Sequence, residues 1–242
     1  MKKVFFFVLF TFLGYLLHSQ SLIGAWETKI LVDSDHIKAD VKIVVVFTKN
    51  HHVASAFDAK TGAFVATFGG SWSMNENNLS QTIEFDSENP DRIGTTKSSK
   101  IKFENGELQM ESDNLTLKRI DDGSPGALSG AWLMSGRKRN GTFQTRDTKK
   151  PRKTMKILSG TRFQWIAYNT ETKQFMGTGG GTYTTIDGKY TENIEFFSKD
   201  NSRIGASLEF DFEIKDDDWH HSGFSSKGAP LYEVWSKRKS KK

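Results

Sequence analysis

The sequence GGGTYTTIDGKYTENIEFF at residues 179–197 has a second version, FGGSWSMNENNLSQTIEFD, at residues 68–86. Around these stretches, Lys42–Gly94 aligns with Lys153–Gly205 without a gap, and both copies share a Gly-Gly pair, an Ile-Glu-Phe triplet and an Arg-Ile-Gly triplet. The repeat is longer than the roughly 20–50 residues of solenoid units. The chain is therefore predicted to be a duplication, in which each copy is a domain with its own core.

The composition supports two globular domains and excludes several kinds of chemistry. The chain has 242 residues, of which 36% are hydrophobic and 12% aromatic, and it contains no cysteine. Disulfides, a thiol nucleophile and a zinc–thiolate site are therefore excluded. The net charge of +5 comes mainly from Lys2, Lys3 and the basic end at 237–242. No basic stripe with interleaved aromatic residues is present, so nucleic acid is not an expected partner.

The first 20 residues have the pattern of a secretory signal peptide. Lys2 and Lys3 precede an apolar run, Val4–Leu17, and polar residues follow it. This run is shorter than the roughly 20 residues that a membrane-spanning helix needs. We therefore expect the protein to be exported, with no transmembrane segment after cleavage; a retained anchor is the alternative.

The remaining chain is predicted to be all-β, with eight strands in each copy. Short alternating or apolar runs are separated by turn-rich points, and no stretch has a useful helical period. Residues 121–127 are acidic and then rich in Gly, Ser and Pro, which makes them the predicted linker between domains at 21–120 and 128–238. The predicted strands lie near 23–31, 41–48, 51–58, 63–73, 79–86, 96–103, 107–112 and 115–120, and near 129–137, 153–159, 161–168, 174–184, 189–197, 206–214, 218–224 and 231–238. The basic segment from Arg137 to Lys153 is predicted to be an exposed loop over a barrel mouth.

Eight strands without a covering helix must pair their edges with one another. Closure into an up-and-down barrel achieves this, whereas a two-sheet sandwich is the alternative. The alternation of side chains along the fifth strand of each copy assigns its two faces. The set predicted to point inward is Leu79, Gln81, Ile83 and Phe85 with Tyr190, Glu192, Ile194 and Phe196. Glu84 and Glu195 lie on the other, polar face, which is predicted to face water.

Two sets of motifs resemble lipocalin-like (calycin) barrels. Gly-Ala-Trp opens both copies, ending at Trp26 and Trp132, and this resembles the Gly-x-Trp start of that family. The resemblance implies that each Trp closes one barrel end and that a basic residue of the last strand, Arg119 or Arg238, lies over it. A further likeness, to secreted lipocalin-like domains of Gram-negative bacteria, rests on Gly179-Gly180-Gly181-Thr182-Tyr183, Tyr190-Thr191-Glu192, Trp219-His220-His221-Ser222-Gly223 and Glu233-Val234-Trp235. It implies eight-stranded barrels in the periplasm or outside the cell, and no established reaction.

The candidate site lies in the second copy, because its polar interior residues are missing from the first. An inward carboxylate at Glu192 needs a partner, since desolvation disfavours its ionised form. The candidate partners are Tyr190, Tyr183, Arg203 and one of the histidines at 220 and 221. Glu192 corresponds to Gln81, so the fold stands without this charge. The residues predicted to bind a ligand are Tyr183, Tyr190, Glu192, Trp219, His221 and Trp165.

Other motifs are assigned to the scaffold. Gly180 and Gly181 lack the residues of a phosphate loop and are predicted to bend the strand. Neighbouring histidines in a strand point to opposite faces, so His51-His52 and His220-His221 each supply one inward ligand. A metal site needs three or four ligands, so neither a metal nor a cofactor is expected.

Three functions remain open from the sequence. The first is an exported binding or accessory protein whose second barrel holds a small apolar or amphipathic ligand. The second is a barrel enzyme of the isomerase or hydrolase type that uses Glu192 as general base; no catalytic set such as a Ser-His-Asp triad is present. The third is a structural or protein-interaction module with filled barrels. Weak contact of the basic tail at 239–242 with anionic polymers or a membrane surface is a further expectation.

Overall fold

The computed structural model describes residues 21–34, 37–124, 126–225 and 227–239. The predicted signal peptide at 1–20 and residues 240–242 of the basic tail lie outside this part of the chain. Within it the protein is all-β, apart from three short 3₁₀ turns at Pro90–Arg92, Glu111–Asp113 and Asn201–Arg203. None of the helical segments described is long and apolar enough to cross a membrane.

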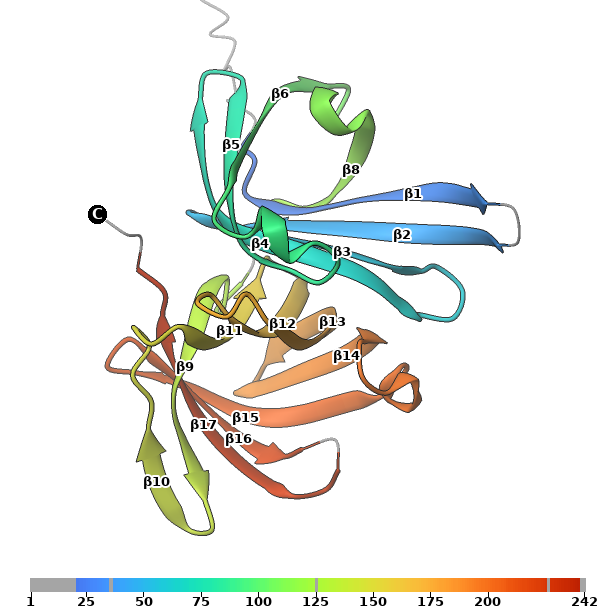
Figure 1. The fold of residues 1–242 in the computed structure, drawn as a ribbon. Coiled ribbons are helices and arrows are strands. Elements are labelled where there is room, and N and C mark those ends of the chain that lie inside the picture. The colour runs from blue at the N-terminus through green and yellow to red at the C-terminus, as the bar shows by residue number, and fades with distance from the viewer. Residues whose placement is uncertain (1–20, 35–36, 125, 226, 240–242) are drawn as a thin grey trace, which may run out of the picture.

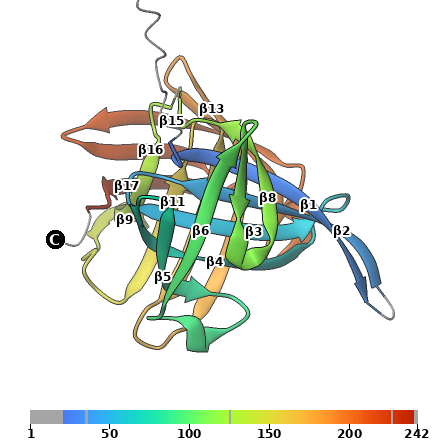
Figure 2. The same ribbon diagram turned by 90° about the horizontal axis from the view of Figure 1, so that it is seen from above.

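The first copy forms a closed barrel of eight antiparallel strands in up-and-down order (Figure 1). Each strand pairs with the next along the chain, and β1 closes the barrel by pairing with β8. The strands are β1 (Gly24–Ser34), β2 (Ile37–Phe47), β3 (His51–Asp58), β4 (Phe64–Asn75), β5 (Asn78–Asp86), β6 (Thr96–Glu104), β7 (Glu107–Met110) and β8 (Leu115–Asp121). Figure 2 shows the second barrel lying behind this one when the molecule is viewed from above.

The second copy repeats this barrel and adds one strand. β9 pairs with both β11 and β17, which closes the sheet, while β10 pairs with the far end of β9 alone. The strands are β9 (Gly130–Arg139), β10 (Thr142–Thr145), β11 (Arg152–Leu158), β12 (Arg162–Asn169), β13 (Phe175–Ile186), β14 (Lys189–Phe197), β15 (Ser207–Lys215), β16 (Asp218–Phe224) and β17 (Pro230–Lys237). The predicted fold of two eight-stranded barrels is confirmed.

The prediction of an exposed loop over a barrel mouth between Arg137 and Lys153 is wrong in its first part, which is strand. β9 continues to Arg139, turns at Asn140 and Gly141, and pairs with β10 as a hairpin that extends beyond the barrel wall. Phe143 of β10 packs against Gly136, so the basic residues of this segment sit on a β-ribbon. A ribbon was not predicted because the many charged residues hide the alternation.

The glycine pairs produce the strand bends that the sequence predicted. The pairing register shifts between Gly69 and Gly70 and between Gly180 and Gly181, at corresponding places in the two barrels. Gly181 faces Ile194, and Glu195 is the extra residue of the bulge. A Cβ atom at Gly181 would lie 1.9 Å from the carbonyl oxygen of Asn193, so only glycine fits this approach.

The same bulge corrects the predicted direction of Phe85 and Phe196. Both are buried, but they point out of their barrels into the contact between them, because the extra residue interrupts the inward–outward alternation. Phe196 stacks on Phe57 and Phe85 packs on Tyr168, each with ring centroids 4.8 Å apart. The other six residues of the predicted inward set are buried as expected.

The two barrels meet through a shared apolar core between their outer walls. Buried side chains of both copies contribute to it: Ala25, Val44, Val46, Val53, Phe57 and Phe85, with Ala131, Leu133, Met155, Ile157, Ile166, Tyr168 and Phe196. Corresponding residues of the two copies face each other, as where Phe64 stacks on Phe175. The contact therefore has the self-complementary character of a twofold interface within one chain.

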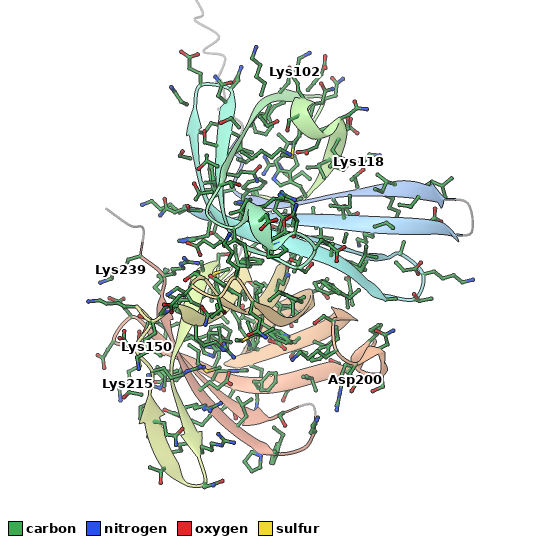
Figure 3. The ribbon with its side chains drawn as sticks, in the orientation of Figure 1. Lys102, Lys118, Lys150, Asp200, Lys215 and Lys239 are labelled. Carbon is green, nitrogen blue, oxygen red and sulfur yellow. The ribbon has the colours of Figure 1, made fainter. Side chains whose placement is uncertain are left out.

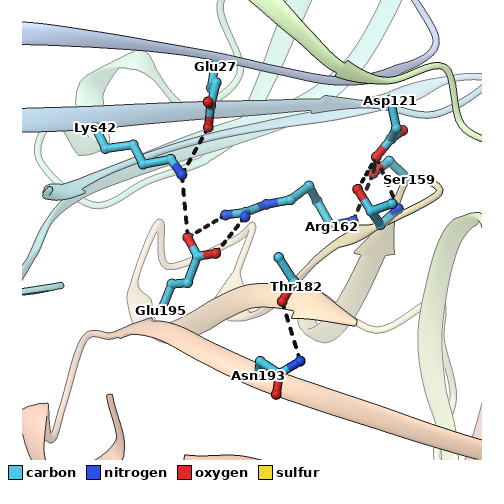
Figure 4. Close-up of polar contacts among 9 residues, drawn as sticks. Glu27, Lys42, Asp121, Ser159, Arg162, Thr182, Asn193 and Glu195 are labelled. Carbon is cyan, nitrogen blue, oxygen red and sulfur yellow. Dashed lines mark hydrogen bonds and ion pairs between the residues drawn. The ribbon is translucent and has the colours of Figure 1, made fainter. Parts of the chain in front are cut away.

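Polar residues border this core, and two of them contradict the prediction that their face meets water. Glu84 accepts two hydrogen bonds of 2.6 Å from Arg238 and one of 3.0 Å from Tyr168, so it joins the first barrel to the second. Glu195 pairs with Arg162 through two bonds of 2.6 and 2.7 Å and lies 3.8 Å from Lys42 (Figure 4). Both glutamates do leave their own barrels, but each is covered by the other copy.

The end of β8 and the linker after it are held against the second barrel. The carboxylate of Asp121 accepts hydrogen bonds from the hydroxyl groups of Ser159 and Thr161, at 2.8 and 2.6 Å, and from the backbone N–H groups of Gly160 and Thr161 (Figure 4). These bonds outweigh burial and lower the pKa of Asp121. The short linker therefore fixes the relative position of the two barrels.

The opening tryptophans occupy equivalent positions in both barrels. Trp26 donates its indole N–H to the carbonyl of Leu22, and Trp132 donates to Leu128, both at 2.9 Å. Arg119 lies 4.0 Å from the centre of the Trp26 ring. The expectation that Arg238 would cover Trp132 is wrong: the strand register places Lys237 opposite Trp132, and its ammonium group lies 5.4 Å from the ring.

Candidate functional site

The second barrel contains a cavity of about 230 Å³. It opens near the end formed by the connections from β14 to β15 and from β16 to β17, opposite the end that holds Trp132. Its wall is mainly apolar and its inner part carries charged and polar groups. The lining residues are Met134, Thr154, Lys156, Trp165, Glu192, Ile194, Phe197, Arg203, Ala206, Leu208, Phe210, His221, Ser225, Leu231, Glu233 and Trp235.

A buried ion pair lies at the inner end of this cavity. Lys156 of β11 donates to Glu192 Oε1 of β14 at 2.7 Å, and the same oxygen accepts the hydroxyl of Tyr190 at 2.8 Å. Lys156 and Glu192 are 6% and 7% exposed, so water screens their attraction poorly. Burial, followed by the nearby charge of Glu192, raises the pKa of Tyr190, which therefore stays a hydrogen-bond donor.

Three aromatic rings surround the ammonium group of Lys156. Its Nζ lies 4.9 Å from the ring centre of Tyr190, 4.8 Å from that of Trp219 and 5.2 Å from that of Trp235. Aromatic faces attract a cation, and more strongly when it has lost its water. The rings and Glu192 together compensate for the burial of this charge.

A second pair of titratable groups lies beside the first. His221 Nδ1 is 3.6 Å from a carboxylate oxygen of Glu233, which is longer than a hydrogen bond, and Trp235 donates to the same carboxylate oxygen at 3.1 Å. Burial and the charge of Lys156 lower the pKa of His221, so its ring is neutral near pH 7. Although burial alone would raise the pKa of Glu233, the charge of Lys156 and the hydrogen bond from Trp235 bring it below its usual value.

His221 lacks hydrogen-bond partners. The side chain is 2% exposed and lines the cavity, yet neither ring nitrogen has a partner among the described residues. The indole N–H of the neighbouring Trp219 is also without a partner there. Buried polar groups are normally satisfied, and leaving one unpaired costs about 1–3 kcal/mol. The inner end of the cavity thus has unused hydrogen-bonding capacity.

The structure brings together part of the predicted ligand-binding set. Trp165, Glu192 and His221 line the cavity, while Tyr190 and Trp219 lie directly behind these residues. Tyr183 is elsewhere: its hydroxyl donates to the carbonyl of Ser159 at 2.6 Å near the closed end. Burial raises the pKa of Tyr183 to about 12. Of the partners considered for Glu192, Tyr190 donates a hydrogen bond to it.

Sequence reasoning missed Lys156, Glu233 and Trp235 as parts of the site. Lys156 aligns with Val45 of the first copy. This difference between the copies marks Lys156 as a candidate site residue. The predicted strand around Lys156 was treated as core, and its ion pair depends on the strand register across the barrel. His220 points outward and bonds to Tyr232 at 2.8 Å, as the alternation of the histidine pair predicts.

The interior of the first barrel differs in chemistry. Its core is apolar around Trp26, and its polar contact is a 3.2 Å hydrogen bond between Gln81 and His52, both buried. Val45 and Gln81 replace Lys156 and Glu192, so the ion pair has no counterpart here. Within the described part of either barrel, no cluster of three or more His, Cys, Asp or Glu side chains is arranged to hold a metal ion.

Comparison with known families covers the half of the chain that holds the cavity. Residues 127–242 match the model of a family described as "Domain of unknown function (DUF4488)". A search of curated proteins finds no match to the chain. The match spans β9 to β17, the complete second barrel with its ribbon and cavity. The C-terminal half of this two-barrel protein is therefore similar to the DUF4488 domains.

Proposed function

We propose that this protein binds a small amphipathic molecule in the cavity of its second barrel. The observation that carries the proposal is His221, which is buried against the cavity with neither ring nitrogen within hydrogen-bond distance of a described residue, Glu233 at 3.6 Å from Nδ1 being the nearest carboxylate. A ligand hydroxyl, carbonyl or amine would satisfy this imidazole. The apolar wall formed by residues such as Ile194, Leu208 and Phe210 suits a hydrocarbon body.

The volume limits the size of the ligand. Because a water molecule occupies about 30 Å³ of liquid, a cavity of about 230 Å³ holds on the order of ten non-hydrogen atoms. The charged groups inside the barrel limit the polarity of the ligand. Because Lys156 is already paired with Glu192, it does not offer a free charge to a ligand. A single polar end that reaches His221 and Glu233 therefore suits the cavity better than a molecule with several charged groups.

The arrangement favours binding over the two other functions. Glu192 is held by the protein itself, because its Oε1 accepts bonds from Lys156 and Tyr190, which is the arrangement of a structural ion pair rather than of a carboxylate kept for a substrate proton. A structural module with filled barrels is disfavoured, because the second barrel contains a cavity. Export to the periplasm or the cell exterior stays part of the proposal, because a binding protein of this kind would meet its ligand there.

Thermal-shift measurements with matched eight-carbon probes test this function. 1-Octanol, octanoate and octylamine share one apolar body and differ only in the polar end. At least one should raise the melting temperature of the wild type, and the rise should shrink in His221→Phe, which keeps the ring packing but cannot form hydrogen bonds. Phe212→Leu, at a partly buried position outside the lining set, is the matched control. Equal shifts in all three proteins, or no shift with any probe, would contradict the proposal.

A further inference from the structure

A second hollow of about 690 Å³ lies where the two barrels meet and is separate from the cavity of the second barrel. The first barrel contributes hydroxyl, amide and indole groups, and the second contributes lysines and one arginine. We call it the inter-barrel cleft. It is lined by Asn50, His51, Ser71, Trp72, Ser73, Ser80, Thr82, Ile83, Glu84, Ile93 and Gly94, with Lys149, Lys153, Thr170, Arg238 and Lys239.

The charge of the cleft is positive. Four cationic side chains and one carboxylate, that of Glu84, line the cleft. Glu84 is already paired with Arg238. Burial, together with the charge of Arg238, lowers the pKa of His51 to about 4, so this histidine is neutral near pH 7. Lys149 and Lys239 are exposed, and neither ammonium group forms an ion pair with any described residue. Two cations at the rim thus remain for an external anion.

The opposite wall of the cleft carries small polar side chains. Ser71 and Ser73 of β4 and Thr82 of β5 line this wall, and the Thr82 hydroxyl is also bonded to that of Thr96 at 3.0 Å. Trp72 lines the same wall, packs on the core of the first barrel and donates its indole N–H to the carbonyl of Thr48. Hydroxyl groups suit the hydrogen-bonding pattern of sugar rings, and the lysine ammonium is a compact point charge that suits sulfate or carboxylate. Single-stranded nucleic acid would instead need a series of aromatic rings for base stacking, whereas the described lining has Trp72 and the imidazole of His51 alone.

We propose that the inter-barrel cleft binds an acidic oligosaccharide, with its sulfate or carboxylate groups at Lys149 and Lys239 and its sugar hydroxyls along β4 and β5. The volume lies within the range of about 300–1,000 Å³ that is usual for small-molecule sites. A site of this kind explains why both barrels are needed in a fixed arrangement, because each supplies one wall. It does not depend on a ligand in the cavity of the second barrel.

Binding of a sulfated tetrasaccharide, measured by isothermal titration calorimetry on the full chain at about 50 mM salt, tests the cleft. The wild type should bind one molecule, and Lys149→Ala/Lys239→Ala should weaken binding about tenfold, because two charge-assisted contacts are lost. Lys102→Ala/Lys118→Ala removes the same charge from the far part of the first barrel and should bind like the wild type (Figure 3). The tetrasaccharide without sulfate should bind at least about tenfold more weakly than the sulfated form.

Three results would overturn the proposal. Equal weakening in both double variants would show that bulk charge, and not the cleft, attracts the saccharide. Absence of binding to the wild type would remove the site. Tighter binding of an eight-nucleotide oligothymidine at the same lysines would assign the cleft to single-stranded nucleic acid instead.

Discussion

The ammonium group of Lys156 lies 2.7 Å from Glu192 Oε1 inside the second barrel, and both side chains are almost fully buried. Removing one partner leaves the other charge without compensation, whereas removing both eliminates that penalty. Glu192→Gln should therefore lower the free energy of unfolding by about 3–5 kcal/mol, and Lys156→Met/Glu192→Gln by clearly less. Urea unfolding at pH 7 measures both. A double variant as unstable as Glu192→Gln would show that the ion pair itself stabilises the barrel.

A second buried pair, Glu84 and Arg238, joins the barrels. The loss of Arg238 would leave Glu84 buried between them, with Tyr168 as its remaining donor. Arg238→Met should thus lower the free energy of unfolding by about 3 kcal/mol, and Glu84→Gln/Arg238→Met should recover part of the loss. The exposed pair of Lys102 and Glu104 provides the control, because Lys102→Met should change stability by less than about 1 kcal/mol. Similar unfolding midpoints for Lys102→Met and Arg238→Met would refute this role.

Stability should fall as the pH decreases, because two histidines of the first barrel are buried in the neutral form. Burial lowers the pKa of His51 to about 4 and that of His52 to about 3, from an ordinary value of 6.5. Below pH 6.5 the unfolded chain takes up protons that the folded chain does not bind. The free energy of unfolding therefore decreases from pH 6.5 down to about pH 4, by about 1.4 kcal/mol per pH unit for each histidine.

The variant His52→Phe isolates one of these contributions. The second barrel has Phe163 at the corresponding position, so the fold accepts a phenyl ring there. Between about pH 4.5 and 6, the slope of unfolding free energy against pH should decrease by about 1.4 kcal/mol per unit in this variant. Urea titrations at several pH values give the slope. An unchanged slope would mean that His52 is protonated in the folded state.

The bulges at the glycine pairs should not accept a side chain. A Cβ atom at Gly181 would lie 1.9 Å from the backbone oxygen of Asn193, and one at Gly70 would lie 2.0 Å from that of Thr82. Gly181→Ala and Gly70→Ala should each cost about 2 kcal/mol or more. Ser73→Ala, at an exposed position on the same strand as Gly70, should stay within about 0.5 kcal/mol. Thermal melts that do not distinguish these variants would contradict the close approach.

Repetition and alternation in the sequence predict the barrels and the inward position of Tyr190, Glu192 and Ile194. They fail at Phe196, because Glu195 is the extra residue of the bulge and shifts the inward–outward alternation of β14 by one position. The glycine pair on the neighbouring strand indicates a bend, but it does not identify the residue of β14 at which the alternation shifts. The shared face between the barrels left a signal in the run Val44-Val45-Val46, which is apolar on both sides of a strand and is typical of burial on both faces.

Pairings across a barrel are harder to predict than strands. Lys156 and Glu192 are far apart in sequence, and they meet only through the register of four neighbouring strands from β11 to β14. The contacts of Arg238 also depend on strand register. A shift of one residue decides whether Arg238 or Lys237 lies over Trp132, and so whether Arg238 is placed to contact Glu84. Differences between the two copies identified Glu192 and would have identified Lys156 in the same way.

Calorimetric titration of 1-octanol, octanoate and octylamine into the wild type and into Ala206→Trp tests the central claim most directly. Ala206 lines the cavity of the second barrel near its open end, so an indole ring at this position fills the space that a ligand needs. We predict that at least one probe binds the wild type with a stoichiometry of one and that Ala206→Trp, folded by circular dichroism, does not bind it. Equal binding to both proteins, or no binding to the wild type, would contradict a ligand site in this barrel.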